Sequence, residues 1–278
     1  MNMPPPSGIV APYTTRLQSI GACIYCGIAQ GPLSAEHIIP LGLSGTLVLP
    51  ASSCPKCATL TSQFEEKVLR GFMRRGRLAM GLRTRHKKRP RPTELPTIFI
   101  QPDDSLVEKQ LPIHEGIQVL HLPVFSKPGF LDATQAPVPS EGIQVAAIDT
   151  ATFGKNTVEV VREHKAAGVR IEDRLDIWAF VRMLAKIAHA YHVAIKGPFP
   201  ADESPLLPLI FGTRWDAASW IGNAEDDPLV KPESSALHLM ALDELQGDDG
   251  SVCSVVRLKL FSTVAGPTYA MATRIQPP

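Results

Sequence analysis

Two Cys-x-x-Cys pairs constrain this chain more than any other feature of its sequence. They are Cys23–Cys26 and Cys54–Cys57, separated by residues 27–53. Each pair can place two thiolates on one tight turn, and four thiolates at this spacing suit a tetrahedral zinc ion. A closed four-sulfur site leaves no open position for water, so the predicted zinc is structural. The intervening segment is longer than a compact zinc ribbon needs, and it contains the dipeptide Glu36-His37.

Cysteine usage also bears on the compartment. Four of the five cysteines are paired as Cys-x-x-Cys, which favours a reducing compartment where thiolates are kept for metal. Cys253 is expected to be a small buried apolar residue. The N-terminus lacks a basic region followed by an apolar one, and no apolar run is long enough to span a bilayer. We therefore expect a soluble cytoplasmic protein with no membrane partner.

The residues around the cysteines predict two strands and a helix. Ser34–Ile39 indicates a strand that ends at Pro40, and Thr46–Leu49 its partner across a glycine-containing loop. Pro55 suits the first turn of a helix. That helix has an apolar stripe at i, i+4 and i+8, made by Phe64, Val68 and Phe72. Glycines at 71, 76 and 81 weaken its later turns, so we expect a break after residue 70.

This order of motifs resembles the HNH nucleases. Cys-x-x-Cys-Gly, Glu-His-Ile-Ile-Pro, a glycine-containing turn and a second Cys-x-x-Cys that opens a helix follow one another in residues 21 to about 70. The similarity is closest to the zinc-clamped branch of that family, whose core is a ββα-metal (His-Me finger) fold. It implies that His37 is the general base that activates water. It also implies that Glu36 binds a catalytic Mg²⁺ or Mn²⁺ and that the products carry a 5′-phosphate and a 3′-hydroxyl.

The sequence departs from the family at two positions. The Asn that braces the His loop is missing, because asparagine occurs only at positions 2, 156 and 223; Ser52 or Ser53 could replace its hydrogen bond. Ala58 stands where the last His or Asn metal ligand is expected. Glu65 is the alternative carboxylate ligand on the same helix face, or else a solvated helix glutamate.

A basic segment follows the predicted helix. Residues 67–92 contain eleven Lys or Arg and no acid, so the net charge of +1 leaves +1 − 11 = −10 for the remainder. Such an island can be a solvated helix face, but its size favours binding to a phosphate backbone. The expected partner is nucleic acid, with DNA as the first expectation and RNA as the alternative. The predicted binding residues are Arg70, Arg74, Arg75, Arg77, Arg83, Arg85, Lys87, Lys88 and Arg89.

The predicted fold class is α+β, with three parts. Residues 1–20 are expected to be an extended leader, residues 21–92 a zinc-bound HNH-like domain with a basic helix and linker, and residues 93–278 an α+β accessory domain of unknown role. The accessory domain should have an antiparallel sheet and one long helix at about Asp173–Ile195. Its predicted strands are Thr97–Ile100, Gly116–Phe125, Gly142–Ile148, Thr157–Val161, Ala236–Leu242, Ser251–Phe261 and Thr268–Thr273.

The long helix also carries a polar stripe. His189 and His192 lie at i, i+3, beside Arg182 and Lys186. Two histidines at this spacing could share a metal ion, but no nearby Cys or acid completes a site. We therefore expect a solvated flank.

Three functions are compatible with these observations. The first is a metal-dependent HNH-like endonuclease, with His37 and Glu36 as catalytic residues. The second is a catalytically degenerate, zinc-stabilised nucleic-acid-binding protein, as Ala58 and the missing Asn indicate. The third is a zinc-clipped protein-interaction scaffold whose working part is residues 96–278.

Overall fold

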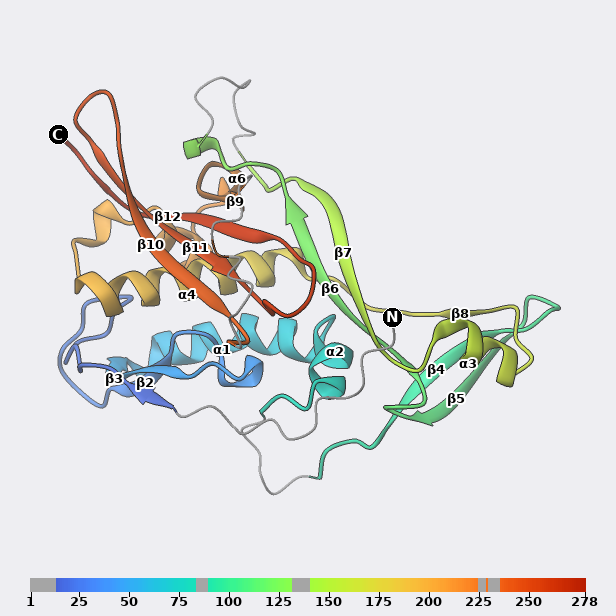
Figure 1. Cartoon of the computed structure of the whole chain (residues 1–278). Coiled ribbons are helices and arrows are strands. Elements are labelled where there is room, and N and C mark those ends of the chain that lie inside the picture. The colour runs from blue at the N-terminus through green and yellow to red at the C-terminus, as the bar shows by residue number, and fades with distance from the viewer. Residues whose placement is uncertain (1–13, 84–89, 132–140, 225–228, 230–235) are drawn as a thin grey trace.

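The computed structural model describes residues 14–83, 90–131, 141–224, 229 and 236–278, and it shows an α+β protein (Figure 1). Within these residues the strands form four sheets. Their one parallel pairing joins β1 (Thr15–Arg16) to β3 (Leu47–Ser53), and every other described pairing is antiparallel. The predicted α+β class with antiparallel sheets is confirmed.

The N-terminal unit contains the two predicted strands followed by the predicted helix, and β1 adds a third strand at the edge of β3. β2 (Ser34–His37) pairs with β3, and the short helix η1 (Leu41–Leu43) lies between them. β3 leads through Cys54 into α1 (Pro55–Arg70). Pro55 occupies the first turn of α1, where its missing N–H costs no intrahelical hydrogen bond.

α1 ends at Arg70, as predicted, and α2 (Arg74–Ala79) begins after a short break. A Cβ atom at Gly71 would lie 2.4 Å from the carbonyl oxygen of Lys67, so the chain bends there without room for a side chain. The break turns α2 toward β6 (Ile117–Phe125).

The middle of the chain forms an arm that projects from the body (Figure 1). Its sheet has the order β5-β4-β8, and the ribbon of β6 and β7 joins the arm to the body. A small apolar core holds it together, with Phe99 and Val160 at its centre. The arm's remaining elements are β4 (Glu94–Ile100), β5 (Leu106–Pro112), β7 (Val145–Gly154), α3 (Thr157–Glu163) and β8 (Gly168–Arg170).

α4 (Ile177–Lys196) is the central helix of the body. Asp176 caps it by accepting a 2.9 Å hydrogen bond from the backbone N–H of Ala179. α4 packs against α1 and against a sheet of order β10-β11-β12-β9. No described helix, α4 included, is long and apolar enough to cross a membrane. The other elements are η2 (Gly129–Leu131), η3 (Ala201–Glu203), α5 (Leu206–Phe211), α6 (Ala217–Trp220), β9 (Ile221–Asn223), β10 (Leu239–Gln246), β11 (Val252–Lys259) and β12 (Thr268–Gln276).

One predicted strand is wrong. Thr157–Val161 forms helix α3, because the side chain of Asn156 accepts a 2.8 Å hydrogen bond from the backbone N–H of Val158 and caps a helix there. β5 was not predicted, since its residues are mostly exposed and lack a clear apolar alternation.

The largest apolar core crosses the predicted boundary at residue 92. It includes Leu49, Phe64 and Val68 from the N-terminal unit, together with Phe180 and Leu258 from the C-terminal part. α4 therefore completes the core of the N-terminal unit as well as that of the C-terminal sheet.

His238 links η1 of the N-terminal unit to the C-terminal part of the chain, through both of its ring nitrogens. Its Nε2 donates to the carbonyl oxygen of Leu43 at 2.7 Å, and its Nδ1 accepts from the backbone N–H of Phe261 at 3.2 Å. Burial lowers the pKa of His238 to about 4. Between about pH 4 and pH 6.5, this imidazole is therefore neutral in the folded protein. In the unfolded chain, a histidine has a pKa of about 6.5 and takes up a proton over the same range.

We expect the free energy of unfolding to fall as the pH drops from about 6.5 to about 4, because protons then bind the unfolded chain preferentially. The fall should be smaller in His238→Gln, which removes one such group. His114→Gln is the matched control, since the His114 side chain is 81% exposed. Chemical denaturation across this pH range measures the effect, and equal pH dependence in the wild type and both variants would contradict it.

Candidate metal centre and the neighbouring buried lysine

The four predicted cysteines meet at one point. The Sγ atoms of Cys23, Cys26, Cys54 and Cys57 all lie within 4.8 Å of one another. Cys26 and Cys54 are 3.7 Å apart, close to the roughly 3.8 Å between two sulfurs on a tetrahedral zinc ion with Zn–S bonds of about 2.3 Å. The four thiols can therefore hold a metal such as zinc. No other described group of three or more Cys, His, Asp or Glu residues comes together in this way.

Local backbone geometry brings the two cysteine pairs together. Gly27 adopts a positive φ of 74°, which closes the first turn, and its N–H donates to the carbonyl of Cys23 at 2.8 Å. The N–H of Ile24 donates to the carbonyl of Ser52 at 2.9 Å and ties this turn to β3. At the start of α1, a hydrogen bond from the backbone N–H of Cys57 lowers the pKa of Cys54 to about 7.

Replacing Cys57 by serine should abolish metal binding and destabilise the N-terminal unit, because this buried thiol is one of the four that can hold a metal. Metal content by elemental analysis, together with thermal unfolding, measures both effects. Cys253→Ser is the control, since Cys253 lies on β11 outside the cluster. Full metal content in Cys57→Ser would contradict the assignment.

Glu36 and Glu65 lie close together, but a lysine ammonium lies between them. Lys186 Nζ is 2.5 Å from Glu36 Oε1 and 2.9 Å from Glu65 Oε1. It also donates to the carbonyl oxygens of His37 at 2.5 Å and Ile38 at 3.3 Å. Four oxygens from β2, from the residue that follows it and from α1 therefore surround one ammonium supplied by α4.

All three charged side chains of this cluster are buried. The exposed fraction is 0% for Lys186 and 7% for both Glu36 and Glu65, so Glu65 is not the solvated glutamate of the alternative interpretation. Burial lowers the pKa of Lys186, but the attraction of Glu36 and then of Glu65 outweighs it and raises the pKa above its ordinary value. The ammonium stays charged, so the two carboxylates as arranged do not fit a divalent cation.

His37 lies on β2 next to Glu36, and its side chain is partly exposed. It pairs with Val48 of β3, whereas Glu36 pairs with Leu49, so the two side chains project from opposite faces of the sheet. The register of this pairing shifts between Ser34 and Glu36. The imidazole therefore does not share the buried face on which Glu36 and Glu65 bind Lys186.

The serines considered as substitutes for the missing asparagine are fully buried. Ser52 Oγ donates to the carbonyl of Pro50 at 2.8 Å, and Ser53 accepts the Ser34 hydroxyl on its backbone carbonyl at 3.1 Å. These two hydrogen bonds stabilise the end of β3, and neither of them involves the loop after His37.

The predicted basic residues divide into an exposed and an inward-facing group. Arg70 and Arg74 are exposed, and Arg70 pairs with Glu66 at 2.7 Å. Arg75 donates to the carbonyl of Pro96 at 2.9 Å, and Arg77 to that of Gly42 at 2.5 Å. Arg75 and Arg77 thus hold neighbouring backbone. Of the remaining predicted residues, Arg83 lies beside β1, and Arg85, Lys87, Lys88 and Arg89 fall outside the described residues.

The prediction of a solvated polar stripe on α4 is wrong. His189 and His192 are 2% and 1% exposed, and Lys186 is completely buried. His189 Nε2 donates to the carbonyl of Ile24 at 2.7 Å, and His192 Nδ1 lies 2.7 Å from Thr273 Oγ1. α4 packs against α1 on one side and the C-terminal sheet on the other, so most of its residues are buried.

Sequence reasoning missed two residues of this site. Lys186 lies 150 positions after Glu36 (186 − 36 = 150), so no local motif connects them. One feature of the sequence could have indicated its role: Lys186 lies in a helix that is apolar on nearly every face. A lysine in such a helix is buried and needs a partner of opposite charge. Tyr25 was the other: burial raises its pKa well above the ordinary value, and Glu36, Glu65 and the thiols of Cys23 and Cys57 add to the effect. The Tyr25 ring packs against that of His189 at a centroid distance of 5.8 Å.

Comparison of this chain with protein-family models, with curated proteins and with solved structures finds no match. The resemblance to HNH nucleases therefore depends on residues 21 to about 70 alone, and the functions that it implies are proposals.

Lys186→Met should lower the free energy of unfolding by about 3–5 kcal/mol, because it leaves two buried carboxylates without their counter-charge. Lys196→Met, at the exposed end of the same helix, should change it by no more than about 0.5 kcal/mol. Urea denaturation at neutral pH compares the two. Equal stability of the two variants would contradict the described role of Lys186.

Proposed function

We propose that this chain is a zinc-stabilised nucleic-acid-binding protein, built on an HNH-like ββα unit that does not hydrolyse phosphodiester bonds. One observation favours nucleic-acid binding over hydrolysis of phosphodiester bonds. The two carboxylates that would hold a catalytic cation, Glu36 and Glu65, bind the ammonium of Lys186 instead. A divalent cation at that point would face an adjacent positive charge in a buried environment, where charge repulsion is strong.

The zinc part of the proposal follows from the donor set. Four thiols that close on one point, three of them buried, match a closed structural site rather than a catalytic one. The N-terminal unit is small, so a metal at this position contributes directly to its folding.

The nucleic-acid part of the proposal depends on the charge of residues 67–92. Arg70 and Arg74 remain exposed on α1 and α2, and Lys67 is exposed one turn before Arg70. Such residues bind the phosphate backbone through charge and give affinity without reading the base sequence. The inward-facing Arg75 and Arg77 support the segment, and the exposed residues make the contacts.

Phosphodiester hydrolysis, as in the HNH nucleases, is the second candidate. It is favoured by His37, which directly follows Glu36 on a paired strand and has a partly exposed side chain. For this function the carboxylates must release Lys186 before they bind Mg²⁺ or Mn²⁺.

Fluorescence anisotropy with labelled single- and double-stranded DNA tests the proposal. We expect binding that weakens with salt, with a slope of about −0.9 per phosphate contact for duplex DNA in a log–log plot. Arg74→Ala should reduce affinity and the steepness of this slope. Arg162→Ala is the matched control, because it removes an exposed arginine from α3 in the arm. Affinity independent of salt, or no binding, would contradict the proposal and leave the protein-interaction alternative.

A nicking assay separates the two candidates. Supercoiled plasmid incubated with the protein and Mg²⁺ or Mn²⁺ should stay intact with the wild type and with His37→Ala alike. Nicking by the wild type that is lost in His37→Ala would favour hydrolysis instead.

A further inference from the structure

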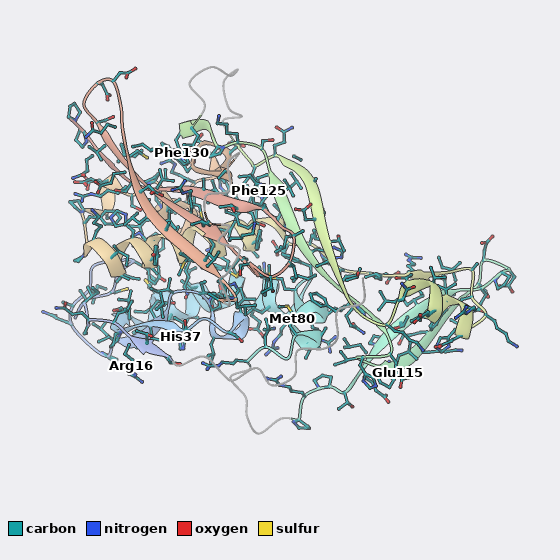
Figure 2. The ribbon with its side chains drawn as sticks, in the orientation of Figure 1. Arg16, His37, Met80, Glu115, Phe125 and Phe130 are labelled. Atoms are coloured by element: carbon teal, nitrogen blue, oxygen red, sulfur yellow. The ribbon has the colours of Figure 1, made fainter. Side chains whose placement is uncertain are left out.

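Trp215 is the one aromatic side chain among the large apolar residues that the described part of the chain exposes, with an exposed fraction of 49%. It lies in the loop between α5 and α6. Phe130 of η2, labelled in Figure 2, lies beside α6 on this part of the body. Tryptophan is enriched among the residues that contribute most to binding, so an indole half open to water indicates a contact surface.

The loop holds this indole in a fixed orientation. Trp215 makes an edge-to-face contact with Trp178 of α4, with ring centroids 4.9 Å apart and an interplanar angle of 86°. Its carbonyl oxygen accepts a 2.6 Å hydrogen bond from the backbone N–H of Gly142. On either side of it, Arg214 Nε donates to Asp216 Oδ1 at 3.0 Å. The edge-to-face contact uses at most one face of the Trp215 ring, so a planar ligand can stack on the ring at a low entropic cost.

Exposed cations lie near the same turn of α4. The carboxylate that caps α4 is 3.5 Å from Lys67 Nζ, and Trp178 follows in the first turn of the helix. The carbonyl oxygen of Arg174, just before α4, would lie 3.6 Å from a Cβ atom at Gly71, so Arg174 lies next to the break between α1 and α2. Lys67, Arg74 and Arg174 are all exposed. An aromatic ring and a group of cations therefore occur together where α4 begins, as in proteins that bind single strands.

We infer that Trp215 stacks on an unpaired base of a single-stranded nucleic acid, while Lys67, Arg74 and Arg174 bind phosphates next to that base. This inference rests on the proposed function and deepens it, because it identifies the single strand as the preferred form of the ligand. Every base has a π face, so an aromatic side chain stacks on it without reading its identity. Inside a duplex, the neighbouring base pairs cover both faces of a base, and the indole has nothing to stack on.

Anisotropy with labelled oligo(dT) and with a DNA duplex compares the wild type with Trp215→Ala, Trp215→Phe and Leu106→Ala. Leu106→Ala is the control, because it shortens an apolar side chain that is 50% exposed on β5 in the arm. Trp215→Ala should bind oligo(dT) about tenfold more weakly, as expected for the loss of one stacked base. Its salt slope should not change, since the indole carries no charge. Trp215→Phe should keep most of the affinity, and all four proteins should bind the duplex equally.

An oligonucleotide of abasic sites tests stacking itself, because it keeps the phosphates of oligo(dT) and lacks the bases. The wild type and Trp215→Ala should bind it equally. Tryptophan fluorescence is the second readout: oligo(dT) should quench the emission of the wild type more than that of Trp215→Phe, which retains Trp178 and Trp220.

The outcomes separate this inference from the proposed function. If the wild type binds oligo(dT) but Trp215→Ala binds it as tightly as Leu106→Ala does, Trp215 is not a stacking residue and the proposed function stands. If Trp215→Ala weakens binding to the duplex or to the abasic oligonucleotide as much as binding to oligo(dT), the inference is likewise overturned. If the wild type binds none of these ligands, the inference and the proposed function both fail.

Discussion

The structure depends on one buried ion cluster, in which the ammonium of Lys186 joins α4 to β2 and α1. Taking a charge out of water costs several kcal/mol, and an isolated buried lysine would lose its proton instead. Here the cost is offset by four oxygens, two from carboxylates and two from backbone carbonyls. An ammonium has three N–H donors, so the cluster uses its whole hydrogen-bonding capacity. The N-terminal unit and the long helix are thereby held in one fixed arrangement.

The same cluster links the thiol site to the rest of the body. Tyr25 lies within the first cysteine pair, and its ring packs against His189 of α4 at a centroid distance of 5.8 Å. Burial raises the pKa of Tyr25, and the nearby carboxylates and thiols raise it further. The cysteines therefore organise the short N-terminal strands, while α4 supplies the apolar surface and the counter-charge that this unit lacks. This arrangement explains why the main core runs through both predicted domains. It also divides the N-terminal sheet into an inner face, which carries Glu36 and Leu49, and an opposite face, which carries Arg16, Val48 and His37.

Local signals in the sequence predicted local structure well. The cysteine spacing predicted the thiol cluster, Pro55 the start of α1, and the glycine at 71 its end. The prediction of a strand at Thr157–Val161 was wrong because it relied on the β-branched residues of this segment. It overlooked Asn156, whose side chain caps the helix that forms there. The environment of Glu36 and Glu65 could not be predicted, since their partner is far away in the chain and its burial follows from packing on both sides of α4. His189 and His192 were misjudged for the same reason: polarity in the sequence indicated solvent where the tertiary fold supplied backbone and hydroxyl partners.

Anomalous diffraction from crystals of the wild-type protein soaked in Mn²⁺ tests the central claim most directly. We predict a zinc peak among the four thiolates, Lys186 Nζ within hydrogen-bonding distance of Glu36 and Glu65, and no manganese peak between those carboxylates. A manganese ion bound at about 2.1 Å to both carboxylates, with Lys186 turned away, would contradict it and return the site to metal-dependent chemistry.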